Sequence, residues 1–283
     1  HQLIILLISS ASILALFNAV TPLTDRIGVS SPYDFGKIRL WGSVGYAVSA
    51  QLCGLVYDAI APVSIYIIFL FGTLTALVCI LRVNDPEVVK TDTKVEYSPK
   101  EAYKSLFKNK QYIIFLLISF FFWGACTANF TYISVFIKSV GGTASMVGTY
   151  QLFATLFEVP GILATDYIVK KFSYKHIMVF ACIMSIINFV WYATLPNPNL
   201  IVAVFVFKGL STILFTMITV RLIMEIVEDK YVSTAFGLQA TIGRGVGAAV
   251  VQLIGGKLID SFSTMRPFYL FLSILIVTAL ALS

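Results

Sequence analysis

The stretch YIIFLLISFFFWGACTANFTYISVFI, residues 112–137, decides the fold class because it carries no charged side chain over its whole length. The hydrocarbon core of a bilayer is about 30 Å thick, and an α-helix needs about 20 residues to cross it. Backbone polar groups in lipid must satisfy one another, which a helix achieves within a single segment. The stretch therefore predicts a transmembrane helix.

Comparable apolar runs recur along the whole chain. Hydrophobic residues make up 58% of its 283 residues and charged residues 12%, whereas a soluble domain carries about 25% charged residues. The composition therefore predicts an all-α membrane protein with about nine transmembrane helices. We expect the spans near residues 2–23, 38–57, 62–82, 112–137, 145–168, 177–195, 199–222, 233–257 and 267–283.

A polar connector at residues 83–111 separates three predicted spans from six. We expect the remainder of an N-terminal helix bundle at 1–82, a cytoplasmic central loop at 83–111 and a C-terminal six-helix bundle at 112–283. The last part of the connector, Ser98 to Lys110, predicts a surface amphipathic helix with Leu106 and Phe107 directed inward. The connector contains six lysines, Lys90, Lys94, Lys100, Lys104, Lys108 and Lys110.

Lysine and arginine residues indicate the orientation. If the connector is cytoplasmic, most of the 20 basic residues fall in inner loops or at inner span ends, and only Lys138, Lys257 and Arg266 fall outside. The net charge of +6 then faces anionic lipid headgroups, and no nucleic-acid partner is needed to explain it. The four cysteines lie in separate apolar runs, so we expect neither a metal site nor a cofactor.

The clearest local motif is Pro22-Leu-Thr-Asp25 followed by Tyr33-Asp-Phe-Gly-Lys-Ile-Arg-Leu-Trp-Gly-Ser-Val-Gly-Tyr46. It joins the inner end of one predicted helix to the start of the next. Asp25 and Arg39 can meet across the two helices, and the glycines permit close packing. A structural salt bridge at a helix turn is one interpretation, and a solute-binding pair is the other.

These segments resemble the major facilitator superfamily, in the branch of galactoside/proton symporters and phenylpropionate transporters. The resemblance implies a major facilitator-type helical bundle in which this chain corresponds to helices four to twelve, with the first three missing. The charge alternation agrees, because it places residue 1 on the outer side. The resemblance also implies that Asp25, Arg39, Tyr46 and Asn18 bind substrate; Tyr46 stands where the galactoside permease has a tryptophan.

Glu158 lies near the middle of its predicted span. A charged residue there costs about 2.5–3.5 kcal/mol on insertion scales, so it should face a cavity or a partner. Gln151, Thr155 and Glu158 share one helical face and form a polar stripe. We expect Gln151 to contact substrate and Glu158 to take up and release a proton. The alternative is a carboxylate that holds a neighbouring helix.

Lys208 and Arg244 are cations inside predicted spans, each on a face with hydroxyl-bearing residues. We expect both to line a cavity opposite Glu158. The resemblance places Lys208 where the galactoside permease has its proton-relay histidine, while the acidic pair of that permease's seventh helix is absent here. Glu158 with Lys208 or Arg244 is therefore the predicted proton-coupling set, and an uncoupled or differently coupled carrier is the alternative.

The segment Gly161-Ile-Leu-Ala-Thr-Asp166-Tyr-Ile-Val-Lys-Lys171 resembles a degenerate form of the superfamily's Gly-xxxx-Asp loop motif. The resemblance implies that Asp166, Lys170 and Lys171 take part in gating. A plain helix cap with a topology anchor would carry the same residues.

Together these features predict a secondary transporter in the bacterial cytoplasmic membrane, monomeric and working by alternating access, with a small polar solute and protons as its partners. A sugar, an oligosaccharide, a nucleoside or an aromatic acid would suit the site. The alternatives are a proton-coupled exporter or antiporter and a non-transporting membrane sensor. An enzyme is not expected, because the spans hold no histidine and no His-Glu-xx-His or Gly-x-Ser-x-Gly motif occurs.

Overall fold

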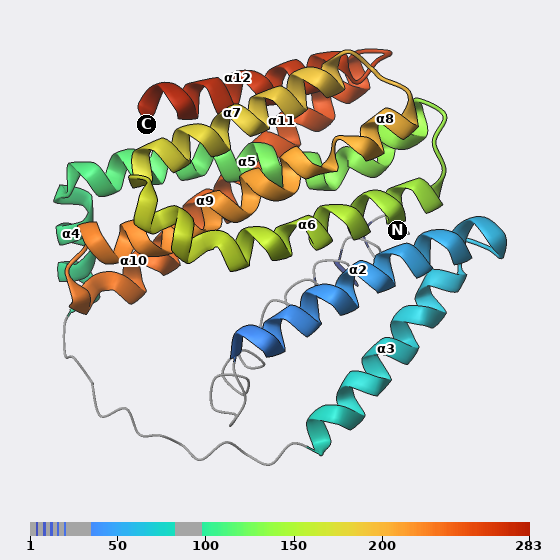
Figure 1. Cartoon of the computed structure of the whole chain (residues 1–283), viewed down its shortest axis with the longest axis horizontal. Coiled ribbons are helices and arrows are strands. Elements are labelled where there is room, and N and C mark those ends of the chain that lie inside the picture. The colour runs from blue at the N-terminus through green and yellow to red at the C-terminus, as the bar shows by residue number, and fades with distance from the viewer. Residues whose placement is uncertain are drawn as a thin grey trace. The chain divides into compact units, whose positions relative to one another are not determined.

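The computed structural model describes residues 35–82 and 98–283, together with helical positions at 4, 8, 9, 12, 13, 16 and 20. Within these residues all the regular elements are helices, which confirms the predicted all-α class (Figure 1). The predicted substrate residues Asn18 and Asp25 lie outside the described residues.

The chain divides into two compact units, one made of residues 1–45 and 66–94 and the other of residues 46–65 and 95–283. Helix α2 (Phe35–Ala59) contributes to both units, and α3 (Ser64–Leu81) lies almost wholly in the first. None of the α3 residues is buried. The predicted division at 83–111 stays a prediction.

The second unit holds the larger helical bundle. Helix α7 packs between α9 and α12, α5 packs on α12 and contacts α9, and α6 packs on α9 (Figure 1). The elements are α4 (Pro99–Lys108), α5 (Lys110–Ser139), α6 (Ala144–Lys171), α7 (Tyr174–Ala193), α8 (Pro198–Ala203), α9 (Phe205–Ile226), the 3₁₀ turn η1 (Asp229–Tyr231), α10 (Val232–Gln239), the π-helical η2 (Ala240–Gly247), α11 (Ala248–Ser261) and α12 (Arg266–Leu282).

Aromatic rings fill the centre of this bundle. Phe122 of α5 stacks on Phe215 of α9 with ring centroids 3.8 Å apart, and both rings are buried. Tyr269 of α12 packs on Phe136 of α5 with centroids 4.6 Å apart. Such pairs contribute about 0.5–1.5 kcal/mol beyond their burial, so these rings hold three helices in one core.

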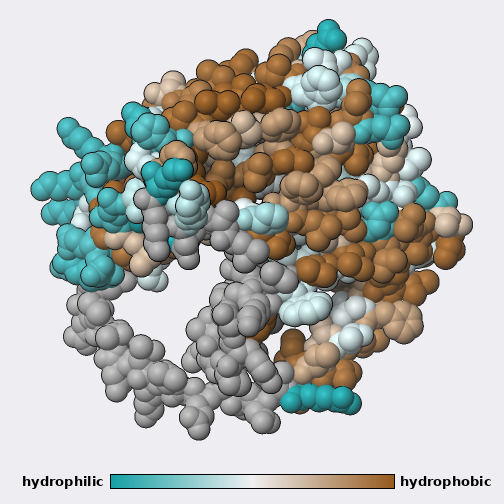
Figure 2. All heavy atoms as spheres, in the orientation of Figure 1, coloured by the Kyte–Doolittle hydropathy of each residue, from teal (hydrophilic) through white to brown (hydrophobic). Residues whose placement is uncertain are grey.

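The outer faces of the helices are apolar as well. Leu253 is 72% exposed and Ile274 63%, and hydrophobic side chains cover most of the bundle face seen in Figure 2. A soluble protein rarely exposes a continuous apolar surface of this kind, whereas lipid requires one. In the described part of the chain, the segments long and apolar enough to cross a membrane are Ser64–Leu81, Lys110–Ser139, Tyr174–Ala193, Pro198–Ile226 and Asp229–Ser261.

Two predicted spans are not single regular helices. The span expected at 199–222 is interrupted at Val204, between α8 and α9, and the span expected at 233–257 contains the π-helical η2. The other predicted spans that begin after residue 35 coincide with α2, α3, α5, α6, α7 and α12. The total of nine spans stays a prediction.

The amphipathic helix predicted at Ser98–Lys110 is present as α4, but one of its two inward residues is wrong. Leu106 is 1% exposed, whereas Phe107 is 51% exposed. The second buried residue is Ala102, one helical turn before Leu106. A small residue at 102 lets α4 lie close to the bundle, and this packing leaves Phe107 on another side of the helix.

Candidate functional site

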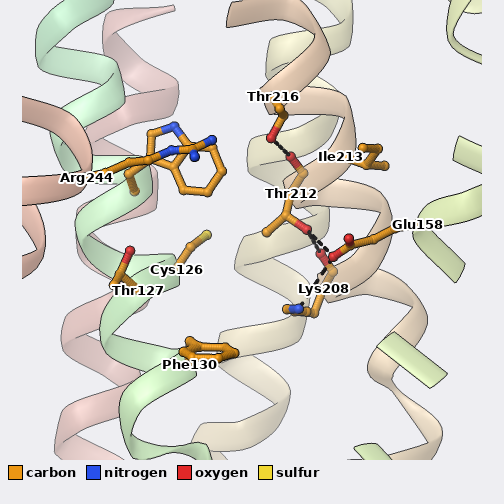
Figure 3. Close-up of a pocket in the computed structure, with 10 residues that line it drawn as sticks. Cys126, Thr127, Phe130, Glu158, Lys208, Thr212, Ile213, Thr216 and Arg244 are labelled. Carbon is orange, nitrogen blue, oxygen red and sulfur yellow. Dashed lines mark hydrogen bonds and ion pairs between the residues drawn. The ribbon is translucent and has the colours of Figure 1, made fainter. Parts of the chain in front are cut away.

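A cavity of about 390 Å³ opens inside the second unit, between α5, α6, α9 and η2 (Figure 3). Its size falls within the range of about 300–1,000 Å³ typical of small-molecule sites. Charged, hydroxyl-bearing and aromatic side chains share its wall. They are Trp123, Cys126, Thr127, Phe130, Glu158, Lys208, Thr212, Ile213, Thr216 and Arg244.

Glu158 and Lys208 form an ion pair on one wall. The Lys208 Nζ lies 3.6 Å from Glu158 Oε1, and the side chains are 16% exposed for lysine and 29% for glutamate. The Thr212 hydroxyl lies 3.5 Å from the same carboxylate oxygen but only 2.9 Å from the Lys208 carbonyl, which therefore takes its proton. Lys208 is thus the close partner of Glu158, and both reach the cavity.

Arg244 lies on another wall, against an aromatic ring. Its guanidinium carbon is 4.0 Å from the ring centroid of Trp123, which is cation–π geometry. Glycines bring η2 this close to α5: a Cβ on Gly247 would stand 2.7 Å from the Phe120 carbonyl oxygen, and one on Gly124 would stand 3.0 Å from the Gly247 carbonyl oxygen. No motif or periodic signal in the sequence marks Trp123 as part of a site.

Each cavity charge lies beside a helix irregularity. Glu158 is two residues before Pro160, Lys208 is four residues after the interruption at Val204, and Arg244 lies within η2. Proline removes one backbone hydrogen bond, and a π-helical turn widens the helix. In a membrane such irregular backbone is tolerated where it is enclosed by protein or lines an aqueous cavity.

Threonines give the cavity hydrogen-bond acceptors. Thr212 and Thr216 donate their protons to backbone carbonyls one turn earlier, at 2.9 Å and 2.8 Å. Their oxygen lone pairs therefore remain for a ligand, since a hydroxyl has one proton and two lone pairs. Lys208 and Arg244 add hydrogen-bond donors, so the wall presents both donors and acceptors.

The remaining predicted substrate residues lie elsewhere in the described chain or lack a described side chain. Gln151 is 8% exposed, and its buried Oε1 has no hydrogen-bond partner among the described residues. Tyr46 lies in α2, is 47% exposed and interacts electrostatically with Lys208 and Glu158. The Arg39 backbone belongs to α2, and its side chain is not described. Gln151 and Tyr46 are not among the residues that line the cavity described above.

The predicted gating residues lie in the last turns of α6. Lys171 is exposed, with its ammonium 5.6 Å from the Tyr167 ring centroid. The side chains of Asp166 and Lys170 are not described, so a charge clasp there stays a prediction.

A contact that sequence reasoning missed joins α2 to α6 at the other end of α6. The Asp58 carboxylate accepts hydrogen bonds from Ser145 N at 2.6 Å and Ala144 N at 3.2 Å, and so caps the first turn of α6. The hydrogen bond from Ser145, followed by other donors and the charge of Lys138, holds the pKa of Asp58 below its usual value.

Glycines allow this approach of the two helices. A Cβ on Gly54 would stand 2.7 Å from the Ala144 carbonyl oxygen, and one on Gly148 would stand 2.6 Å from the Ala50 carbonyl oxygen. Lys138 adds a contact, with its ammonium 4.7 Å from the Tyr57 ring centroid. Small residues at a helix–helix contact are the usual means of close helix packing in membranes.

Known proteins resemble this chain over most of its length. A family model described as the MFS_1 like family matches residues 2–270. YwbF, an uncharacterized transporter of Bacillus subtilis, is 26% identical over 266 residues, which are 93% of this chain and 66% of that protein. A maltose permease of Geobacillus stearothermophilus is 26% identical over 264 residues, which are 92% of this chain and 66% of the permease.

The solved structure of a mutant of the nucleoside transporter NupG has the same fold. It matches with a TM-score of 0.74 at 17% sequence identity, over 87% of this chain and 66% of that one. The chain therefore spans about two thirds of the length of each of these proteins.

Proposed function

Because the chain belongs to the MFS_1 like family of the major facilitator superfamily, we propose that the whole protein is a proton-coupled secondary transporter of a small polar organic solute. Solute and proton share the cavity between α5, α6, α9 and η2, and access alternates between the two sides of the bacterial cytoplasmic membrane. The observation that carries this proposal is the Glu158–Lys208 ion pair, which lies inside a lipid-facing bundle and reaches the cavity.

Stability alone does not account for that pair. Taking two charges out of water costs several kcal/mol each, and well-packed apolar residues in place of a buried pair are often neutral or stabilising. The carboxylate is 29% exposed, so it retains access to the cavity and to any proton that reaches it. A pair that costs stability and stays accessible favours a functional role.

Protonation gives this pair two states. With Glu158 ionised, Lys208 is held at 3.6 Å and its ammonium is partly neutralised. With Glu158 protonated, the attraction is lost and Lys208 is free to donate its hydrogen bonds to a solute oxygen. Loss of the proton restores the ion pair and displaces the solute. Proton and solute therefore bind together and leave together, which is symport.

The cavity wall supports a polyhydroxylated solute. Thr212 and Thr216 offer acceptors, Lys208 and Arg244 offer donors, and Trp123 and Phe130 offer apolar ring faces. A sugar ring has hydroxyl groups at its edge and C–H groups on its faces, so it matches this mixture. One relative carries the name maltose permease, which makes maltose the first solute to test.

The test is uptake by the full-length protein in proteoliposomes with an imposed inward proton gradient. We expect accumulation of maltose or another polyhydroxylated solute, abolished by Glu158→Gln, while exchange of solute across the membrane continues without a gradient. Glu225→Gln is the matched control, because it removes an exposed carboxylate from the end of α9 outside the cavity.

Each outcome bears on the proposal. Gradient-driven accumulation that survives Glu158→Gln removes this residue from the coupling. Solute leaving as protons enter indicates an exporter or antiporter. A protein that binds solute but moves none is a sensor, and the transport proposal then fails.

A further inference from the structure

Helix α4 differs from the other helices in that it runs across the end of the bundle. Figure 1 shows it turned across the start of α5. Asn109, at φ −78° and ψ 102°, ends α4 and begins α5, so the chain changes direction at a single residue. The corner is fixed, because the Asn109 side chain accepts from Tyr112 N at 3.1 Å and donates to the Ile226 carbonyl at 2.7 Å.

The buried side of α4 is narrow. Ala102 and Leu106, four residues apart, are 0% and 1% exposed and face α5 and α10. Nothing else in the helix is buried among the side chains that the structure describes. Among the described residues, none buries the rest of its described surface.

That surface has three chemically distinct sides. A helix turns by about 100° per residue, so Tyr103 and Phe107 lie about 100° to one side of the buried pair and Glu101 and Ser105 about 100° to the other. The side opposite the buried pair carries three lysines one turn apart, Lys100, Lys104 and Lys108. Tyr103 and Phe107 are 45% and 51% exposed, and the three lysines are exposed as well.

This order of sides matches a helix lying at a membrane surface. Aromatic side chains take one flank, acidic and hydroxyl side chains take the opposite flank, and lysines lie between them. Aromatic residues favour the boundary between headgroups and acyl chains, and lysines favour anionic headgroups. A helix facing water on both flanks would have no reason to expose two large aromatic residues one turn apart.

We propose that α4 is an interfacial helix that binds anionic phospholipid of the inner leaflet. Lys100, Lys104 and Lys108 contact the headgroup phosphates, and Tyr103 and Phe107 enter the upper acyl region. Glu101 and Ser105 face the cytoplasm. The proposed ligand is an anionic lipid for two reasons. The lysine side of α4 is positively charged, and the adjacent side, with Tyr103 and Phe107, is apolar. Hydrophilic side chains at this end of the bundle are visible in Figure 2.

The headgroup contact is tested with native mass spectrometry of the full-length protein, titrated with phosphatidylglycerol and, separately, with phosphatidylcholine. The triple variant Lys100→Gln, Lys104→Gln, Lys108→Gln should lose about tenfold or more of the preference for phosphatidylglycerol, since each lysine near an anionic surface contributes to attraction. The matched control is the triple lysine-to-arginine variant, which keeps the charge and should keep the preference. An unchanged preference in the glutamine variant overturns the headgroup assignment.

The aromatic flank is tested by fluorophores attached to Phe107→Cys and, as its control, Glu101→Cys in full-length protein reconstituted in liposomes. A label at 107 should be quenched by nitroxide lipids and shielded from iodide, and a label at 101 should show the reverse. Equal iodide quenching at both positions would overturn the interfacial placement. Neither measurement depends on transport, so both stand or fall separately from the proposed symport.

Discussion

The position of Glu158 in the sequence predicts part of its environment in the structure. Its place in a span predicts its depth in the membrane, and depth predicts that it needs a partner. The direction in which a side chain leaves its helix depends on how neighbouring helices rotate, so Lys208 and Arg244 were equal candidates. The structure places Lys208 3.6 Å from the carboxylate and Arg244 on Trp123.

Removing the lysine of the ion pair should destabilise the protein more than removing both charges. Lys208→Met leaves a carboxylate in the bundle without its close partner, and breaking a buried pair costs about 3–5 kcal/mol, less here because both side chains are partly exposed. We expect a lower apparent melting temperature for the full-length protein in detergent, and partial recovery in the double variant with Glu158→Gln.

The control for this measurement is Lys257→Met, which removes an exposed lysine of α11. It should leave the melting temperature nearly unchanged. A double variant as unstable as Lys208→Met alone would mean that the two charges do not depend on each other.

The Trp123 ring should matter for solute binding through Arg244. A cation–π contact contributes about 0.5–2 kcal/mol, and it orients the guanidinium toward the cavity. Trp123→Phe keeps a weaker ring face, and Trp123→Leu keeps none. We expect the Kd for solute, measured by isothermal titration, to rise from parent to phenylalanine to leucine. Equal Kd values for the phenylalanine and leucine variants would rule out the ring face as the cause.

At the scale of elements, most of the structural features that the sequence did not predict lie in α6 and η2. Hydrophobic length predicted α6 well, but the contact of Gly54 and Gly148 with backbone atoms requires two helices to be placed first. The expectation that Arg244 shares a helical face with a hydroxyl-bearing residue, here Thr241 three residues before it, assumed a regular α-helix. Because η2 is π-helical, that spacing shifts, and Thr241 does not line the cavity.

The cap of α6 should respond to pH in a defined direction. Hydrogen bonds from Ser145 and Ala144 favour the ionised form of Asp58 and lower its pKa in the folded protein. The contribution of the ionised Asp58 cap to stability is therefore complete above the ordinary carboxyl pKa of about 3.9. It is lost as the pH falls through the lower pKa that Asp58 has in the folded protein. We expect the difference in apparent melting temperature between parent and Asp58→Asn to stay constant from neutral pH down to that range and then to shrink.

Asp260→Asn is the matched control for this pH series, because Asp260 is an exposed carboxylate near the end of α11. Its effect should not follow the same curve. A difference between parent and Asp58→Asn that grows as the pH falls would contradict the capping role.

At the scale of the whole molecule, composition and apolar run length were enough for the all-α membrane class. The motif around Asp25 and Arg39 was enough for the family, which the match over residues 2–270 confirms. A family of permeases also agrees with the expectation that the chain is not an enzyme. The sequence predicted a cavity at Glu158, Lys208 and Arg244, but not its other lining residues, because these depend on helix rotation, on η2 and on close glycine contacts.

The most direct test of the account is whether water and solute reach the cavity. Thr127→Cys is introduced into full-length protein whose native cysteines are replaced by alanine, and labelling by a membrane-impermeant thiol reagent is followed with and without solute. Leu253→Cys is the control, because Leu253 of α11 is 72% exposed and lies outside the cavity. The account predicts that position 127 is labelled and that solute protects it, while position 253 resists the reagent. Labelling of 253 with none at 127 would contradict it.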